Sequence, residues 1–198
     1  VDGDLVLATM ARVRELERRG AEVEVMAADV TDRQAMAQVV RAVRTRFGAL
    51  HGIVHMAGVL DDGLIQLRTP AQTQRVLAPK LAGAQVLDEV TQEQPPELFV
   101  VFGSTSGLAG IPGQCDYAAA NAGLDAFANW RSGVRPGRTL AVDWGIWQDA
   151  GMVAGATNAT AAPARPWLGT RTERDGEVEF VGTWSPRTHW QLAEHRVR

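Results

Sequence analysis

Three side chains in the middle of the chain have types and spacing that suit carbonyl chemistry. Tyr117 is the only tyrosine, and it stands at the start of an expected helix, just after a glycine-rich loop. Asn121 follows four residues later, so the two side chains share a helix face. Ser104 lies thirteen residues before Tyr117, at the end of an apolar segment. A serine hydroxyl can hold a carbonyl oxygen while a phenol protonates that oxygen as hydride reaches the carbon.

Lys80 is the cation that could assist such a proton transfer. A free phenol has a pKa of about 10, and a nearby cation lowers it. Lys80 shares a helix face with four apolar residues: Val76, Leu77, Ala84 and Leu87. A lysine on an apolar face is rarely buried without a partner. The alternative is a lysine whose stem packs in the protein while its ammonium group extends to water.

Alternating helices and strands must position these residues. The apolar pattern predicts helices over 5–19, 31–47, 70–90 and 116–130, and strands over 21–28, 50–55, 98–102 and 139–143. A capping-box pattern begins at Thr31, and Pro70 occupies a first helical position. The strands over 98–102 and 139–143 are expected to be buried. This order predicts an α/β fold with a parallel, doubly wound (Rossmann-like) sheet and helices on both faces.

Ligands of such sheets bind beyond the carboxyl ends of the strands. The rule points to four places: Asp29-Val30, Ala57-Gly58, Ser104-Thr105-Ser106 and Asp143-Trp144-Gly145. At Ala57 and Gly58, the small side chains would let a flat ring approach the backbone. Asp29 could accept a hydrogen bond from an adenine amino group, or cap the following helix together with Thr31. Trp144 and Trp147 are expected to be packing residues.

Five segments resemble the ketoreductase domains of modular polyketide synthases, which are short-chain dehydrogenases. They are Phe102–Gln114 with Tyr117–Ala126, Pro79–Ala84, Val142–Trp147, Ala28–Val30 and His55–Val59. The resemblance covers roughly residues 20–152. Ordinary short-chain dehydrogenases carry lysine four residues after the tyrosine and asparagine on the earlier helix. Lys80 and Asn121 exchange these positions, as ketoreductases of this family do.

The resemblance implies an NADPH-dependent enzyme that reduces a β-ketoacyl group on an acyl carrier protein, with other domains of a multienzyme as further partners. It implies that Tyr117 is the proton donor, Ser104 the carbonyl ligand, and Lys80 and Asn121 the supporting pair. The residues that it assigns to the cofactor are Asp29, Val30, Ala57, Gly58, Lys80 and Tyr117.

The stereochemical outcome is implied by a second part of the resemblance. Leu60-Asp61-Asp62 is similar to the motif of B-type ketoreductases, which form a D-configured alcohol, and Gln114 joins these residues on the substrate side. No tryptophan lies just before Tyr117, and the residue two positions after it is alanine, not proline. The alternative for Asp61 and Asp62 is a solvated turn before Gly63.

The two ends of the chain differ from its centre. No Gly-x-Gly-x-x-Gly turn occurs before residue 20, and the first two strands of the usual fold are not evident, so we expect poor cofactor affinity for these residues alone. We expect ketoreductase residues over 1–152, a linker over 153–165, and a different domain over 166–198. That last range resembles the opening of a double-hotdog dehydratase of polyketide synthases, in which His195 matches the catalytic base. The alternative is a surface histidine.

Composition limits the remaining classes of function. A formal net charge of -3 without a basic stripe argues against nucleic acid as a partner. No apolar run approaches the ~20 residues that span a bilayer. The single cysteine, Cys115, excludes an internal disulfide and fits the cytoplasm. No metal site is expected. Two alternatives remain: a free-standing short-chain dehydrogenase and a non-catalytic structural module.

Overall fold

The computed structural model describes residues 3–145, 170–174 and 177–181. The chain divides into two compact units, Val1–Ile146 and Trp147–Arg198. All residues of the candidate site except His195 lie in the first unit.

The first unit is built on a parallel sheet, as the sequence predicts. Its strands are β1 (Gly52–His55), β2 (Leu98–Ser104) and β3 (Arg138–Trp144), with β2 in the centre. The β1 ladder ends where His55 pairs with Val101, whereas β3 follows β2 as far as the pair of Ser104 and Trp144. The carboxyl end of β2 therefore extends beyond β1.

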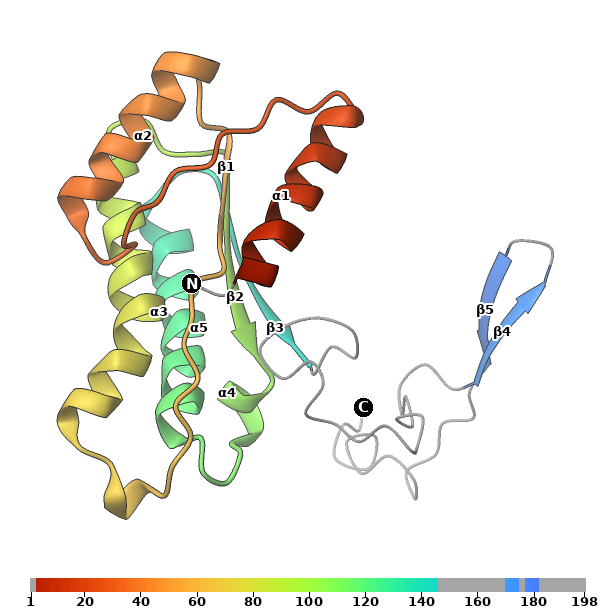
Figure 1. The fold of residues 1–198 in the computed structure, drawn as a ribbon. Helices are drawn as coiled ribbons and strands as arrows, with labels where there is room; N and C mark the ends of the chain where they lie inside the picture. Colours follow the sequence, from red (N-terminus) through yellow and green to blue (C-terminus); the bar gives the residue numbers. More distant parts are fainter. Residues whose placement is uncertain (1–2, 146–169, 175–176, 182–198) are drawn as a thin grey trace, which may run out of the picture. The chain divides into compact units, whose positions relative to one another are not determined.

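Three helices pack together beside this sheet (Figure 1). They are α2 (Arg33–Phe47), α3 (Pro70–Thr91) and α5 (Cys115–Val134). The helix α3 begins as predicted, with Thr69 and Gln72 forming a reciprocal capping box, and it continues through Pro79. The cap of helix α2 lies one residue later than the capping pattern at Thr31 suggested. This cap is Asp32, whose carboxylate accepts hydrogen bonds from the backbone N–H groups of Gln34 and Ala35.

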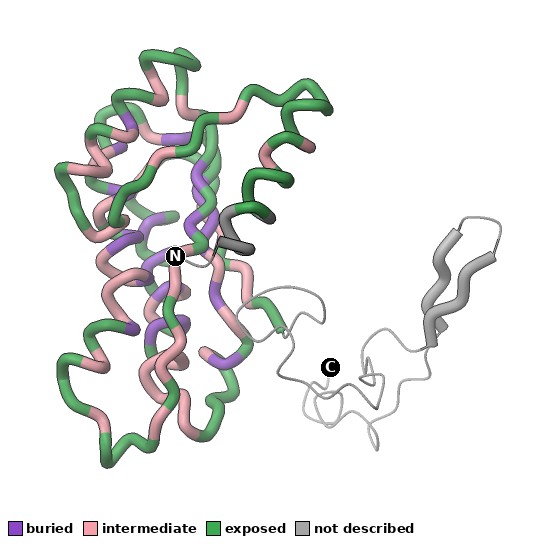
Figure 2. The backbone as a smooth tube through the Cα atoms, in the orientation of Figure 1, coloured by how far each residue is buried: buried purple, intermediate pink, exposed green. Residues whose placement is uncertain are grey.

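The core lies between the sheet and the pair α3–α5, where the buried segments concentrate in Figure 2. Phe99 of β2 is completely buried, and its ring lies 5.9 Å from that of Phe127 on α5. Gly123 of α5 faces α3 so closely that a Cβ atom there would lie 2.7 Å from Cδ2 of Leu81. The absence of a side chain at this position allows the two helices to approach each other.

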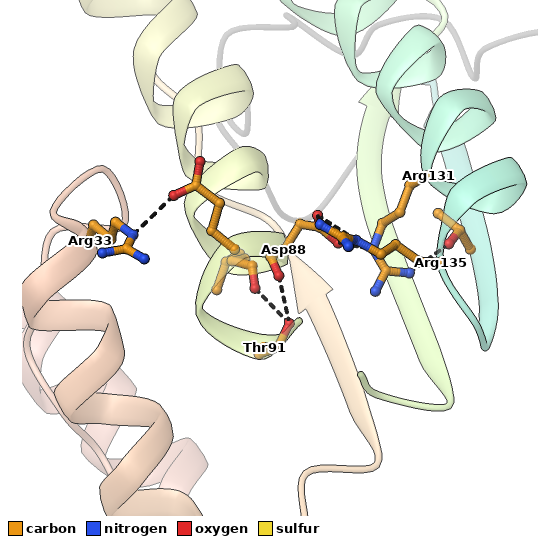
Figure 3. Close-up of polar contacts among 8 residues, drawn as sticks. Arg33, Asp88, Thr91, Arg131 and Arg135 are labelled. Carbon is orange, nitrogen blue, oxygen red and sulfur yellow. Dashed lines mark hydrogen bonds and ion pairs between the residues drawn. The ribbon is translucent and has the colours of Figure 1, made fainter. Parts of the chain in front are cut away.

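A buried ion network joins the C-terminal parts of α3 and α5 (Figure 3). Asp88 accepts hydrogen bonds from Arg131 Nε and Arg135 Nη2, both at 2.8 Å. Arg131 also donates to Thr139 Oγ1 on β3, and its guanidinium lies 4.3 Å from the Phe99 ring centroid. We call Asp88, Arg131, Arg135 and Thr139 the Asp88 network.

Two predictions about the sheet are wrong. Residues 21–28 form no strand, although their pattern alternates, because no described segment provides a ladder for them. Strand β3 forms as predicted but is not buried, since all of its residues are partly or fully exposed. Within the described sheet β3 is an edge strand, hydrogen-bonded to β2 alone.

The first helix, α1 (Gly3–Arg18), forms as predicted, and three of its apolar side chains are exposed. They are Leu7, Met10 and Leu16. Figure 1 shows α1 across the sheet from α3 and α5. No helix in the described part of the chain is long and apolar enough to cross a membrane.

The remaining elements are short. The first unit contains a 3₁₀ turn, η1 (Ile65–Leu67), and a four-residue helix, α4 (Ser106–Ala109). In the second unit, β4 (Thr170–Arg174) and β5 (Glu177–Val181) pair in an antiparallel hairpin.

Candidate active site

Lys80 is buried at the carboxyl edge of the sheet, with only 3% of its surface exposed. Its Nζ donates a hydrogen bond to the backbone carbonyl of Phe102, at 2.8 Å, just beyond the end of the β1 ladder. The alternative of an ammonium group that extends to water is therefore wrong. Burial lowers the pKa of Lys80 from 10.5 to about 8, although the Asp143 carboxylate acts in the opposite direction.

Gly58 provides the space for this lysine. A Cβ atom at Gly58 would lie 3.2 Å from Lys80 Cε, which is closer than side chains normally pack. The small residue after β1 thus has a structural role that the sequence did not reveal. His55 supports the same region, since its buried Nε2 donates to the Lys80 carbonyl at 2.9 Å. Burial lowers the pKa of His55, so this histidine is neutral near pH 7.

Tyr117 lies in the first turn of α5, beside the buried lysine. The Lys80 ammonium lies 5.5 Å from the centroid of the Tyr117 ring, within the range of a cation–π interaction. The tyrosine is partly exposed. The two side chains that the sequence selected from different helices therefore meet at the carboxyl edge of the sheet.

Ser104 and Asn121 lie next to this pair but make other contacts. Ser104 is the last residue of β2, and its Oγ accepts a hydrogen bond from Ser106 N at 3.2 Å. Asn121 is completely buried, and its Nδ2 donates to the Tyr117 carbonyl at 2.8 Å and to Ser106 Oγ at 3.1 Å. Asn121 therefore holds the first turn of α5 to α4.

The segment with Asp61 and Asp62 is bound to the loop that precedes Tyr117. Gln114 Nε2 donates to Asp62 Oδ2 at 2.9 Å, and Gly63 N donates to the Gly113 carbonyl at 2.7 Å. Leu60 is partly buried. Asp61 is partly buried and Asp62 is exposed, so the segment is a turn at the surface that also contacts the loop before Tyr117.

Arg68 strengthens the connection, and the sequence gave no sign of its role. Its side chain is 6% exposed and lies between Asp61, at 3.3 Å, and Asp116, at 2.6 Å. Arg75 forms a second ion pair with Asp61. The hydrogen bond from Arg75 and the charge of Arg68 lower the pKa of Asp61. Asp116 directly precedes Tyr117, so Arg68 couples the Asp61 loop to the start of α5.

The two residues predicted at the adenine side have local partners. Asp29 Oδ1 accepts hydrogen bonds from Thr31 N and Thr31 Oγ1, both at 2.8 Å, which lowers the pKa of Asp29. Asp29 thus stabilises the turn before α2, and the helix cap itself is Asp32. Val30 packs against Gly83 of α3, where a Cβ atom would lie 2.8 Å from Val30 Cγ1.

Two tryptophans and a histidine complete the set of predicted residues. Trp144 packs against Phe102, with ring centroids 5.4 Å apart, as expected of a packing residue. Trp147 and His195 lie outside the described residues. A surface hollow between α2 and α3 is lined by none of the predicted site residues.

Similarity to solved structures identifies the fold. A short chain dehydrogenase from Mycobacterium avium matches with a TM-score of 0.62 at 21% identity, over 69% of this chain and 51% of that one. A ketoreductase domain from the bacillaene assembly line matches with a TM-score of 0.71 at 37% identity, over 79% of this chain and 38% of that one. The fold is that of the short-chain dehydrogenases.

The family is defined more narrowly by sequence. The family model described as the KR domain matches residues 6–149. Polyketide synthase PksL of Bacillus subtilis is 37% identical over 153 residues, which are 75% of this chain and 3% of the relative. The chain belongs to the KR domain family, the oxidoreductase domains of polyketide synthases, and it spans a small fraction of that curated relative.

Proposed function

We propose that this chain carries the proton-donating part of an NADPH-dependent ketoreductase, which converts a β-ketoacyl group on an acyl carrier protein into a D-β-hydroxyacyl group. The observation that carries the proposal is the Lys80 ammonium, buried 5.5 Å from the Tyr117 ring centroid. A positioned acid with a neighbouring cation suits proton delivery to a ketone. Other domains of the same multienzyme would deliver the substrate.

Ala57 and Gly58 suit the nicotinamide side of the cofactor. Both residues are partly exposed and carry at most a methyl group, so a flat ring can approach their backbone. A bound reduced nicotinamide would supply the hydride for the ketone carbon. We assign Asp29 and Val30 to the adenine side on the basis of the family resemblance, which is also the basis for the preference for NADPH.

Tyr117 completes the reduction on the oxygen. As hydride adds to the carbon, the electron pair of the carbonyl π bond moves to the oxygen. The Tyr117 O–H bond then breaks and its proton forms the new O–H bond of the alcohol. Ser104 donates a hydrogen bond to the same oxygen, and the Lys80 ammonium stabilises the phenolate that remains. Asn121 keeps the first turn of α5 in place through its contacts with α4.

Asp61 and Asp62 are the residues that we propose for the choice of substrate face, with Leu60 and Gln114. Their segment is held against the loop before Tyr117 by the contacts of Asp62 with Gln114 and of Asp61 with Arg68. A substrate beside Tyr117 would therefore meet a fixed loop. This arrangement supports a stereochemical role for the segment.

The test is reduction of a β-ketoacyl thioester with NADPH by the complete protein that contains these residues. Tyr117→Phe should lower kcat by about 10²–10⁴-fold, because only the hydroxyl of the proton donor is lost. Loss of reduced-nicotinamide absorbance gives the rate, and chiral analysis gives the configuration.

Ser132→Ala is the matched control, since it removes an exposed hydroxyl from the same helix. An unreduced substrate, or a Tyr117→Phe rate within threefold of the original, would refute the proposed function. An L-configured alcohol would refute only the assignment of Asp61 and Asp62.

Residues 166–198 are proposed as the start of a dehydratase domain, with His195 as its base. This proposal rests on the sequence resemblance. Its test is whether the complete protein eliminates water from the β-hydroxyacyl product, and whether His195→Ala abolishes that step without affecting the reduction.

A further inference from the structure

A single buried arginine joins two segments of the proposed active site at the start of α3. Arg68 directly precedes Thr69, the residue that caps α3. Its Nε donates to Asp116 Oδ2 at 2.6 Å, and its Nη1 lies 3.3 Å from Asp61 Oδ2. Asp116 stands in the first turn of α5, directly before Tyr117. We call residues 60–63 the Asp61 segment, and Arg68 links this segment to the turn that carries the proposed proton donor.

Further contacts limit how Arg68 and its partners can move. A Cβ atom at Gly63 would lie 3.2 Å from Arg68 Cδ, so the arginine packs against the backbone of the Asp61 segment. On the other side, Asp116 Oδ1 accepts a hydrogen bond from Thr73 Oγ1 of α3 at 3.2 Å. Because the Arg68 side chain is buried, water screens its ion pairs less than those of exposed arginines.

Two other hydrogen bonds connect the same part of the molecule, but they end before α5. Gln114 donates to Asp62, and Gly63 donates to the Gly113 carbonyl. Both partners belong to the loop that precedes the helix. Among the described residues, Arg68 is the one that connects the Asp61 segment by hydrogen bond or ion pair to α5 itself.

The shape of the guanidinium group makes this connection specific to arginine. Arginine presents its N–H groups in a rigid planar fork, so Nε and Nη1 of Arg68 can serve two carboxylates at once. Lysine carries the same charge on one nitrogen atom at the end of a flexible stem. Arg75 also pairs with Asp61, but its side chain is 61% exposed and the described residues show no ion pair between it and Asp116.

We propose that Arg68 is a positioning residue, which fixes the Asp61 segment relative to Tyr117 and thereby the face that a bound ketone presents to the hydride. The proposal rests on the proposed function. Arg68 acts through Asp61 and Asp116, because its own side chain is buried between them. A displacement of about 1 Å that originates far from the reacting atoms can lower a rate by on the order of 10²-fold.

The chain offers a measurement that needs no activity, because Tyr117 is its only tyrosine. Labelling with ¹³C-tyrosine gives one Cζ resonance, which reports the surroundings of Tyr117 alone. Arg68→Lys should shift this resonance, since one of the two carboxylates loses its donor. Arg75→Lys is the matched control, because it changes an exposed arginine that also pairs with Asp61, and it should leave the resonance nearly unchanged. Circular dichroism checks that both variants fold.

A second substitution tests whether the effect passes through Arg68. Asp61→Asn should shift the Tyr117 resonance in the original chain and should add little in Arg68→Lys, because the connection is already broken there. Equal shifts in Arg68→Lys and Arg75→Lys, or no shift in Arg68→Lys, would overturn the proposal. If Arg68→Lys does not fold, Asp61→Asn alone decides, and a Tyr117 resonance that ignores it would overturn the proposal.

Activity separates this proposal from the proposed function. In the complete protein, Arg68→Lys should lower kcat by about 10–10²-fold with little change in KM, and it should raise the share of the minor alcohol stereoisomer. A merely structural role would reduce the amount of folded enzyme without changing the ratio of the two alcohols.

The two proposals can fail independently. If the Tyr117 resonance behaves as expected but the original protein reduces no β-ketoacyl thioester, the proposed function fails and the link through Arg68 stands. If the original protein reduces the substrate and Arg68→Lys gives the same ratio of alcohols, the positioning role fails alone.

Discussion

Two groups of buried polar side chains join α3, α5 and the sheet, and they differ in how fully their hydrogen bonds are satisfied. In the Asp88 network, both carboxylate oxygens of Asp88 accept hydrogen bonds from arginines. Around Lys80, the Oδ1 atoms of Asn121, Asp125 and Asp143 have no partner among the described residues. The first group lies near the C-terminal ends of the helices and the second at the carboxyl edge of the sheet.

The difference indicates a structural role for the Asp88 network and a chemical role for the polar side chains around Lys80. A completely satisfied network fixes its members in one arrangement. Unsatisfied acceptors in a native protein require an explanation, such as a catalytic role or an ordered water molecule. The comparison predicts that substitutions in the Asp88 network lower stability, whereas substitution of Lys80 changes how stability depends on pH.

The largest effect on stability is expected from Asp88→Ala. The substitution leaves the guanidinium of the completely buried Arg131 without its counter-charge. Breaking a buried ion pair in this way costs about 3–5 kcal/mol of unfolding free energy. Urea denaturation followed by circular dichroism measures the loss, and a loss below about 1 kcal/mol would show that the network does not hold the helices together.

Lys80 should make stability depend on pH in a defined window. Its pKa is about 8 in the folded chain, against 10.5 for the ordinary group. Between these values the unfolded chain binds a proton that the folded chain lacks, so the free energy of unfolding rises with pH. Below the window both states carry the ammonium, and the burial cost is fully present. The total rise should reach about 3 kcal/mol.

Denaturation of the original chain and of Lys80→Met at pH values from 7 to 11 isolates this effect. The variant should be more stable near pH 7 and should lack the rise that Lys80 causes. Parallel curves for the two proteins would contradict the burial of the ammonium.

The smallest effect is expected from the ion pair of Arg33 on α2 with Glu89 on α3, and Arg33 is labelled in Figure 3. Their side chains are 67% and 52% exposed, and the atoms that pair lie 3.1 Å apart. Exposed pairs contribute about 0–1 kcal/mol. Glu89→Gln should therefore shift the urea midpoint only slightly, and the shift should vanish at high salt. A loss comparable to that of Asp88→Ala would remove the distinction between buried and exposed pairs.

Local signals were sufficient to predict most of the packed elements. The capping box at Thr69 and the proline at position 70 act within one turn, so the start of α3 could be placed from the sequence. The pattern over 21–28 failed because a strand also requires a neighbour, which alternation alone does not supply. The exposure of β3 depends on its place at the edge of the described sheet, and a continuous apolar pattern does not specify that place.

The candidate site also contains some features that the sequence predicted and others that it did not. The helical spacing predicted that Lys80 turns inward, and the structure confirms it. The contact of Asn121 with Ser106 depends on α4, a four-residue helix without a sequence signal. The ion pairs of Arg68 with Asp61 and Asp116 join segments that are far apart in the sequence, so no local pattern indicates them.

The carbonyl of Phe102 that receives the Lys80 ammonium has a consequence for variation among related chains. Every amino acid supplies this oxygen, so the docking point of the ammonium does not depend on which side chain follows Val101. The contact with Lys80 therefore sets no requirement on the side chain at position 102, and the constraint on that side chain comes from its packing against Trp144.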